Sequence, residues 1–140
     1  PGGHSSAPRK DNAIYELADA LKKIEAYTFP VSYSPMTLAS LKAAGEQTPG
    51  ELGAAMVAFA ANPADEAAIA ALRADPSTVG SIGTTCIATM LRAGHAENAL
   101  PQRATATVNC RSFPGIGIEA TEKALKDAIG NEGVAFKLIS

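Results

Sequence analysis

The sequence is poor in the residue types that most often carry catalysis. Its 140 residues include two histidines, two cysteines and no tryptophan, and aromatic residues make up 5% of the chain. The histidines, His4 and His95, lie far apart without a second histidine or a carboxylate cluster at metal-binding spacing, so we do not expect the chain to hold zinc by itself. Phosphate-binding loops and dinucleotide fingerprints are absent as well. These absences indicate a chain without a complete catalytic centre.

The charge balance and the hydrophobic runs give no reason to expect nucleic acid or a membrane as partner. Twelve Lys and Arg residues against 14 Asp and Glu residues leave a net charge of -2. No apolar run approaches the roughly 20 residues that a membrane span needs. With 46% hydrophobic residues, the chain is typical of one folded domain. Pro1 follows no initiator methionine or signal peptide and is interpreted as a cut edge, which leaves the compartment unknown.

The two cysteines, Cys86 and Cys110, lie in strand-like segments and lack the paired spacing of a zinc or redox motif. Two interpretations stay open. They are either small buried hydrophobic residues, the commoner case, or partners in a disulfide across two strands.

The first half of the chain has the pattern of helices. Asp11 or Asn12 is predicted to cap a first helix, in which hydrophobic residues follow at helical spacing up to Ile24. The segment 35–80 is rich in alanine and interrupted by proline, which predicts a helical insertion of short helices. Its predicted buried residues are Leu38, Leu41, Leu52, Met56, Phe59, Ile69 and Leu72.

After Thr84 the hydrophobic period changes to two, which predicts strands over 85–92 and 103–111. A second helix with Gly130 as its C-terminal cap follows, and the apolar alternation over 134–138 predicts a last strand. With one more strand ending near Gly2, the order predicts an α+β fold of the ferredoxin-like split βαβ type. In that fold, an antiparallel sheet carries two helices on one face. The helical insertion would lie between the first helix and the following strand.

Three polar residues are candidates for substrate contacts. His4 follows two glycines in a turn predicted over residues 2–6, and its imidazole could stabilise an oxyanion or bind a carboxylate. Arg111 lies in the open-face register of its strand and could hold a carboxylate with two hydrogen bonds. Asn98 could bind a substrate amide or carboxylate. Each also has a plain structural interpretation, as a turn histidine, an exposed strand arginine or a turn asparagine.

Taken in order, these motifs resemble the lid, or dimerisation, domain of the M20 family of zinc metallopeptidases. Residues 2–8 (GGHSSAP), followed by 12–14 (NAI) and a helix, resemble its start. Residues 94–101 (GHAENALP) and 109–115 (NCRSFPG) resemble its second half. The helical insertion is similar to that of the carboxypeptidase S-like branch, which includes N-acyl-amino-acid hydrolases. The resemblance predicts a single lid domain over residues 1–140.

Membership of this family implies a division of labour. A separate catalytic domain, absent from this chain, would hold two zinc ions through His, Asp and Glu ligands, with a Glu as general base, so the chain alone is expected to be inactive. By the same resemblance, His4 would polarise the scissile carbonyl, and Asn98 and Arg111 would bind the substrate backbone or its terminal carboxylate.

The same resemblance implies three partners. They are the catalytic domain of the same polypeptide, a second copy joined through the edge strand 85–92 beside the first helix, and a peptide or N-acyl amino acid substrate.

A stand-alone ferredoxin-like module that binds a small metabolite and dimerises is the alternative, and a pure assembly domain is a further one, because this fold hosts many functions. A closed pocket within the chain or its dimer would favour the metabolite-binding module. Convergence of His4, Asn98 and Arg111 on an open surface would favour the lid.

Overall fold

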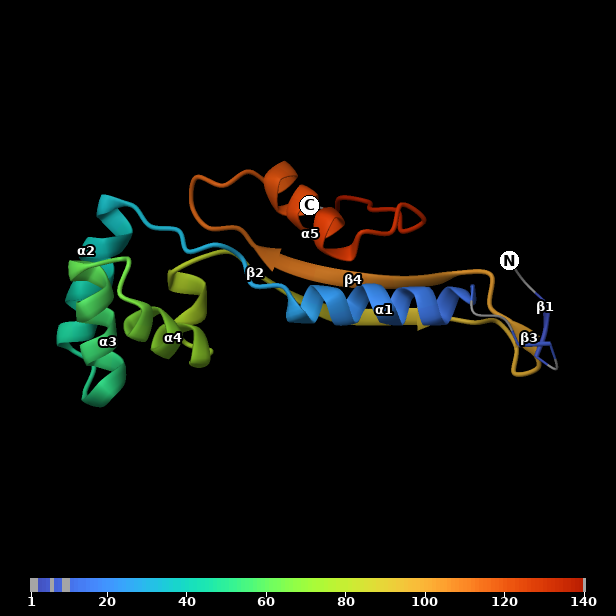
Figure 1. The fold of residues 1–140 in the computed structure, drawn as a ribbon, viewed down its shortest axis with the longest axis horizontal. Coiled ribbons are helices and arrows are strands. Elements are labelled where there is room, and N and C mark those ends of the chain that lie inside the picture. Colours follow the sequence, from blue (N-terminus) through green and yellow to red (C-terminus); the bar gives the residue numbers. More distant parts are fainter. Residues whose placement is uncertain (1–2, 6, 9–10, 140) are drawn as a thin grey trace. The chain divides into compact units, whose positions relative to one another are not determined.

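A computed structural model describes residues 3–5, 7–8 and 11–139 of the chain. The fold is α+β and fits the split βαβ arrangement, as predicted (Figure 1). The chain divides into two compact units. We call them the sheet unit, which comprises residues 1–28, 86–110 and 117–140, and the helical unit, which comprises residues 29–85 and 111–116.

The two helices of the sheet unit have the caps that the sequence predicts, Asn12 and Gly130. Helix α1 (Ala13–Ala26) is capped by Asn12, whose side-chain oxygen accepts a hydrogen bond of 2.8 Å from the backbone N–H of Ile14. Helix α5 (Ile118–Ile129) ends at Gly130, which has the left-handed φ of 65° that glycine adopts without strain.

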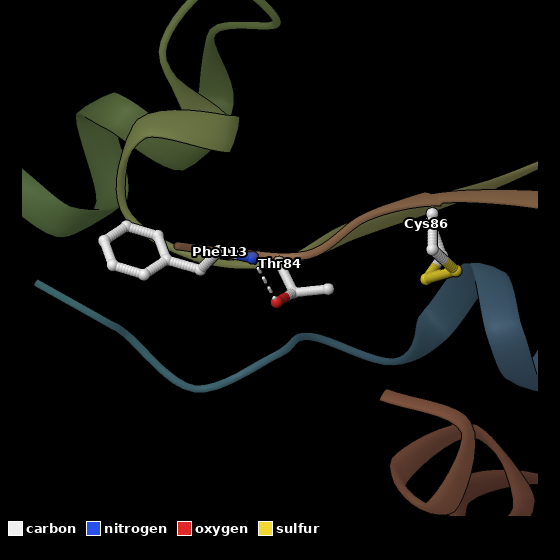
Figure 2. Close-up of a disulfide and its surroundings, with 4 residues drawn as sticks. Thr84, Cys86 and Phe113 are labelled. Carbon is white, nitrogen blue, oxygen red and sulfur yellow. Dashed lines mark hydrogen bonds between the residues drawn. A yellow bond between two sulfur atoms is a disulfide. The ribbon is translucent and has the colours of Figure 1, made fainter. Parts of the chain in front are cut away.

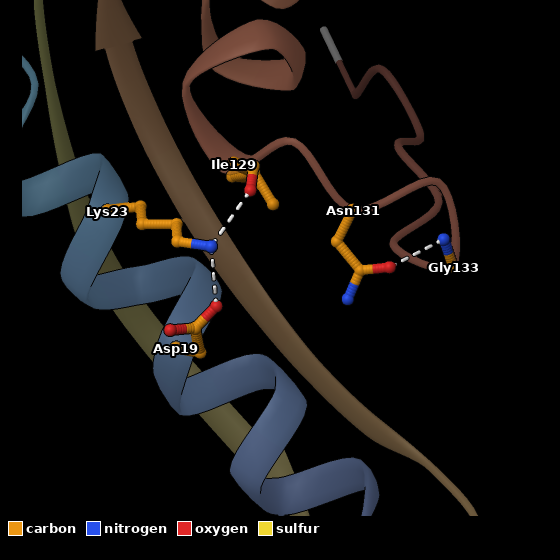
Figure 3. A network of polar contacts seen from close by, with 5 residues as sticks. All are labelled: Asp19, Lys23, Ile129, Asn131 and Gly133. Atoms are coloured by element: carbon orange, nitrogen blue, oxygen red, sulfur yellow. Dashed lines mark hydrogen bonds and ion pairs between the residues drawn. The ribbon is translucent and has the colours of Figure 1, made fainter. Parts of the chain in front are cut away.

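Helices α1 and α5 pack against each other through their apolar faces and one charged side chain. The Nζ of Lys23 donates a hydrogen bond of 3.2 Å to the carbonyl oxygen of Ile129 and forms an ion pair of 2.9 Å with Asp19 (Figure 3). A carbonyl at the end of a helix lacks an intrahelical partner, so Lys23 satisfies an acceptor at the negative end of α5. The buried residues of the two helices are Ala20, Ile24, Thr121, Leu125 and Ile129.

Strands β2 (Thr85–Ala93) and β4 (Ala104–Arg111) form a two-stranded antiparallel sheet. Cys86 and Cys110 are joined by a disulfide with their Cα atoms 4.1 Å apart, so the cross-strand alternative holds (Figure 2). Counting along the antiparallel strands from this pair places Thr89 opposite Thr107. The hydroxyl of Thr89 donates a hydrogen bond of 3.5 Å to the carbonyl oxygen of Thr107, which agrees with this register.

The two faces of β4 differ in exposure, as its alternating sequence predicts. The covered face consists of half-buried residues, and the open face consists of exposed ones. The covered face carries Ala104, Ala106, Val108 and Cys110, and the open face carries Thr105, Thr107, Asn109 and Arg111.

The turn predicted over residues 2–6 is wrong at Gly3 and His4. These two residues form the short strand β1 (Gly3–His4), which pairs antiparallel with β3 (Ala99–Leu100). Gly3 lies opposite Leu100, and His4 lies opposite Ala99. Residues about a hundred positions apart are thus paired through their backbones. Strands of only two residues show no hydrophobic period, so the sequence pattern could not predict this pairing.

The predicted last strand over 134–138 is also wrong, because residues 134–139 form no strand. In a split βαβ fold this segment pairs with the strand that precedes α1, and in the described residues that position holds only β1, which is paired with β3. Phe136 instead lies half-buried beside α5, with the Nζ of Lys126 5.5 Å from the centre of its ring. A turn precedes this segment, in which the Gly133 N–H donates to the Asn131 side chain (Figure 3).

The helical unit contains three helices, α2 (Pro35–Glu46), α3 (Gly50–Ala61) and α4 (Glu66–Ala74), followed by the short 3₁₀ turn η1 (Val79–Ser81). These elements fall within the predicted insertion 35–80, apart from the last residue of the 3₁₀ turn. Helix α2 begins with a capping box between Ser34 and Thr37, and Asp65 caps α4.

One helix start differs from its prediction. The sequence of residues 48–51 (TPGE) predicts a capping box, but α3 begins after Pro49 without a side-chain cap. Thr48 instead donates its hydroxyl proton to the carbonyl oxygen of Ala44 at 2.8 Å, which closes the end of α2.

The core of the helical unit lies among its three helices and is close to the one predicted. Phe59 and Leu72 are fully buried, and Leu38, Leu52 and Ile69 are partly buried against the core. The buried cluster comprises Leu41, Ala55, Met56, Phe59, Ala68, Leu72 and Ile82.

Two glycines let α2 and α3 approach each other closely. A Cβ atom at Gly53 of α3 would lie 2.8 Å from the carbonyl oxygen of Gly45 in α2 and would also clash with that of Thr48 in the connecting loop, and one at Gly45 would lie 2.9 Å from the carbonyl oxygen of Gly53. Any larger residue at these two positions would force the backbones apart.

The segment 111–116 joins the helical unit from a distant part of the sequence. The Phe113 N–H donates a hydrogen bond of 3.0 Å to the hydroxyl oxygen of Thr84, and both residues are buried (Figure 2). The helical unit therefore consists of two pieces of the chain.

Candidate functional site

Two of the three candidate residues lie side by side along the backbone. The β1–β3 pairing places His4 opposite Ala99, the residue after Asn98. The Ser5 N–H donates a hydrogen bond of 3.0 Å to the carbonyl oxygen of Asn98, which extends this pairing by one residue. The side chain of Asn98 is exposed. The imidazole of His4 lies outside what the structure describes, so its role stays a prediction.

Arg111, the third candidate, is the last residue of β4 and is exposed on the open face. It belongs to the segment 111–116 of the helical unit, whereas His4 and Asn98 belong to the sheet unit. Along the strand itself, the eight residues of β4 at about 3.3 Å per residue separate Ala104 from Arg111 by about 23 Å. The role of Arg111 in binding a carboxylate also stays a prediction.

One hollow lies on the surface of the sheet unit, away from these residues. It has a volume of about 460 Å³, is open to solvent, and contains none of the three candidate residues. An ion pair of 2.7 Å between Lys123 and Asp127 forms part of its wall, and this hydrogen bond raises the pKa of Lys123. The lining residues are Tyr27, Ala120, Lys123, Ala124, Asp127 and Ala128.

The described residues offer no site for a metal. Among them, no group of three or more His, Cys, Asp or Glu side chains is placed to hold an ion. In the same part of the chain, no helix has both the length and the apolar character that crossing a membrane requires.

Strand β2 is the most exposed apolar element of the sheet unit. From Ile87 to Ala93 every residue is exposed, and Ile87, Met90 and Leu91 expose 68%, 54% and 61% of their surface. Within the described sheet, β2 pairs with β4 on one side only. A long apolar strand with unpaired backbone groups on one edge is a template for pairing with another strand.

Helix α1 also carries exposed apolar residues that the sequence pattern assigned differently. Ile14, the first residue of the hydrophobic stripe that predicts this helix, is 40% exposed, and Tyr15 is 62% exposed. The spacing of hydrophobic residues tells which face they share but not whether anything covers that face. Sequence reasoning therefore missed this apolar surface, and the signal that could have found it is that Ile14 and Tyr15 are adjacent rather than three or four positions apart.

Residues 1–137 match the M20 family of domains described as peptidase dimerisation domain. The chain belongs to the M20 dimerisation domain family. This confirms the family predicted from the residues 2–8, 94–101 and 109–115, and with it the assignment to a hydrolase family of peptidases.

A similar human protein supports the same branch of the M20 family. Over 140 residues the chain is 30% identical to the N-fatty-acyl-amino acid synthase/hydrolase PM20D1 of Homo sapiens. This alignment covers 99% of this chain and 27% of the human protein. This M20 dimerisation domain therefore spans about a quarter of the length of its curated relative. No solved structure matches the chain.

Proposed function

We propose that this chain is the dimerisation and substrate-gripping lid domain of a dizinc M20-type peptidase or amidohydrolase. It would act as one domain over residues 1–140, with the helical insertion 35–80 as part of it. The match of residues 1–137 to a peptidase dimerisation domain carries this proposal. The relative's much greater length also supports it, because it leaves room for a catalytic domain in the same polypeptide.

The two zinc ions would belong to that catalytic domain. The described residues of this chain offer no cluster of ligands for them. Bound there, the ions would polarise the scissile carbonyl and activate a water molecule. The contribution of the lid would be to bind the substrate, orient it and exclude bulk water when it closes.

His4 would donate a hydrogen bond to the carbonyl oxygen of the scissile bond. Two observations support this role. Backbone pairing with Ala99 fixes the position of His4 although it lies near the start of the chain, and the Ser5 N–H bond to Asn98 holds the next residue. A donor held in place before the reaction stabilises negative charge on the oxygen at little reorganisation cost.

The substitution His4→Ala in the full-length enzyme tests this role. Loss of one such donor typically lowers kcat by about 10²–10³, and we expect KM to change far less. His95→Ala is a matched control, because His95 is the other histidine and is exposed in the loop before β3. Unchanged kinetics for His4→Ala would remove this residue from the mechanism.

Asn98 and Arg111 would bind the carboxylate of a peptide or an N-acyl amino acid. The human relative is named as a synthase and hydrolase of N-fatty-acyl amino acids, and such compounds carry a free carboxylate. We expect Arg111→Ala to raise KM for these substrates more than for their amides, because a guanidinium forms two charged hydrogen bonds with a carboxylate. Arg103→Ala, an exposed arginine just before β4, is the control. Equal losses for acid and amide would contradict the assignment.

Two copies of the domain would join through β2. The exposed apolar side chains of β2 and its unpaired edge support this, together with the dimerisation function of the matching family. The intact mass of the native polypeptide that carries residues 2–8 tests the lid function as a whole. A species far larger than 14.3 kDa is expected, and a mass near 14.3 kDa would favour the stand-alone metabolite-binding module.

A further inference from the structure

The disulfide reveals which backbone groups of β2 point to its free edge. Opposed residues of antiparallel strands alternate between hydrogen-bonded pairs, with Cα atoms about 5.5 Å apart, and non-hydrogen-bonded pairs about 4.5 Å apart. The Cα atoms of Cys86 and Cys110 are 4.1 Å apart, so this pair is of the second kind. The N–H and C=O groups of Cys86 therefore point away from β4, and those of Ala88, Met90 and Arg92 follow by alternation.

The free edge of β2, and not that of β4, is the one available to a partner in a split βαβ fold. In this fold, the two parallel strands joined by the first helix lie on either side of a third strand. Strand β4 takes this inner position, and its residues on the covered face are half-buried from Ala104 to Cys110. Strand β2 takes the outer position and is exposed on both faces from Ile87 onward.

Two-fold symmetry limits how two β2 strands can pair. In a symmetric antiparallel pair, each residue lies opposite the one at equal distance on the other side of the axis. The outward-pointing residues must face one another, which places the axis at a residue and not between two residues; near the middle of the strand this allows Ala88, Thr89 or Met90, and axes farther out leave more of the strand unpaired. Thr89 is the midpoint of β2 (Thr85–Ala93), so only the axis at Thr89 pairs the whole strand.

The side chains favour the same axis. An axis at Thr89 places Ile87 opposite the partner's Leu91 on the open face. The two-fold symmetry produces this pair twice, so all four of these exposed apolar side chains would be covered. The small Ala88 then lies opposite the partner's Met90. An axis at Ala88 or Met90 would leave Ile87 and Leu91 facing residues other than each other.

The charges of β2 are compatible with this arrangement. Arg92 is the one charged residue in the strand, and an axis at Thr89 places it opposite the partner's Cys86 rather than opposite another arginine. Like charges in directly opposed positions would weaken the pairing.

We propose that two copies of this chain pair their β2 strands antiparallel with the two-fold axis at Thr89, so that Ile87 of each copy packs on the partner's Leu91. This rests on the proposed dimerisation through β2 and adds the register, which fixes where each lid lies relative to the other.

Single cysteine substitutions in the native polypeptide test this register, with the native disulfide left intact. In the proposed register, Thr89 faces its own copy in a non-hydrogen-bonded pair about 4.5 Å apart, within the range that a disulfide spans. Ala88 and Met90 lie diagonally to their own copies, at about 7–8 Å. Under mild oxidation, Thr89→Cys should form the covalent dimer roughly tenfold faster than Ala88→Cys or Met90→Cys, measured on non-reducing gels and by peptide mapping.

The outcomes separate the register from dimerisation itself. Fastest cross-linking of Ala88→Cys or Met90→Cys would place the axis at that residue and overturn the proposal. If sedimentation shows a dimer but none of the three variants cross-links, the register is wrong while dimerisation stands through another surface. A monomeric wild-type polypeptide would overturn both the dimerisation and the register.

Discussion

The helical unit and the sheet unit solve the problem of burying apolar surface in different ways. In the helical unit, two glycines bring α2 and α3 together and the large side chains Phe59 and Leu72 are completely buried. In the sheet unit, β2 leaves large apolar side chains such as Ile87 and Leu91 in solvent, and a disulfide joins it to β4. The helical unit thus buries its largest core side chains among its own helices, whereas the large apolar side chains of β2 stay exposed within this chain.

The largest expected effect comes from emptying the core of the helical unit. Phe59→Ala removes a fully buried ring and should lower the free energy of unfolding by about 3–5 kcal/mol. Hydrogen exchange resolved by residue should show the loss of protection first in α2, α3 and α4. A change below about 1 kcal/mol would contradict the view of this unit as a tightly packed body.

The disulfide should have the next largest effect, and in the sheet unit. The double substitution Cys86→Ala with Cys110→Ala releases a cross-link between residues 24 apart in sequence, which should cost about 3 kcal/mol. Denaturant unfolding of the variant and of the reduced wild type should agree. Disagreement between them would show that the substitutions disturb the fold by some route other than loss of the cross-link.

The crossing of α2 and α3 predicts a smaller cost. Gly53→Ala places a Cβ atom against the carbonyl oxygens of Gly45 in α2 and of Thr48 in the connecting loop, and relieving these contacts should cost about 1–3 kcal/mol. Gly80→Ala is the matched control, because a Cβ atom there meets nothing within 4 Å. Equal stabilities of the two variants would mean that the helices can separate freely.

The smallest effect on folding is expected at the edge of the sheet. Ile87→Lys changes an exposed side chain, so the free energy of unfolding of the isolated subunit should change by less than about 0.5 kcal/mol. The same substitution should shift the dimer toward monomer in sedimentation, because it places a charge in the proposed contact. Met36→Lys, at a 79% exposed position in the helical unit, should leave both quantities unchanged. A dimer undisturbed by Ile87→Lys would remove β2 from the interface.

The parts of the fold that depend on local sequence were predicted well. The caps Asn12 and Gly130 and the alternation of β4 are local patterns, and the structure has each of them as expected. The unformed last strand over 134–138 and the β1–β3 pair depend on partners far away in the sequence. A period of two identifies a possible strand but not the strand that it pairs with.

The candidate site was predictable to the same limited extent. The sequence identified His4 and Asn98 as candidates from two separate motifs. Only the structure shows that the backbones of these two motifs are hydrogen-bonded to each other. The disulfide between Cys86 and Cys110 stayed open for a similar reason, because it requires the register of two strands. Exposure of Ile87 and Leu91 depends on what covers the sheet, which no pattern within the strand contains.

The insertion is one continuous stretch of sequence, but the helical unit that contains it is made of two separate segments of the chain. Segment 111–116 completes the helical unit, where buried Phe113 is bonded to Thr84. Deleting residues 35–80 would therefore not leave an intact smaller domain, because it would remove most of the unit in which Phe113 is buried. Anyone shortening the protein by removing the insertion must therefore redesign the 111–116 segment together with it.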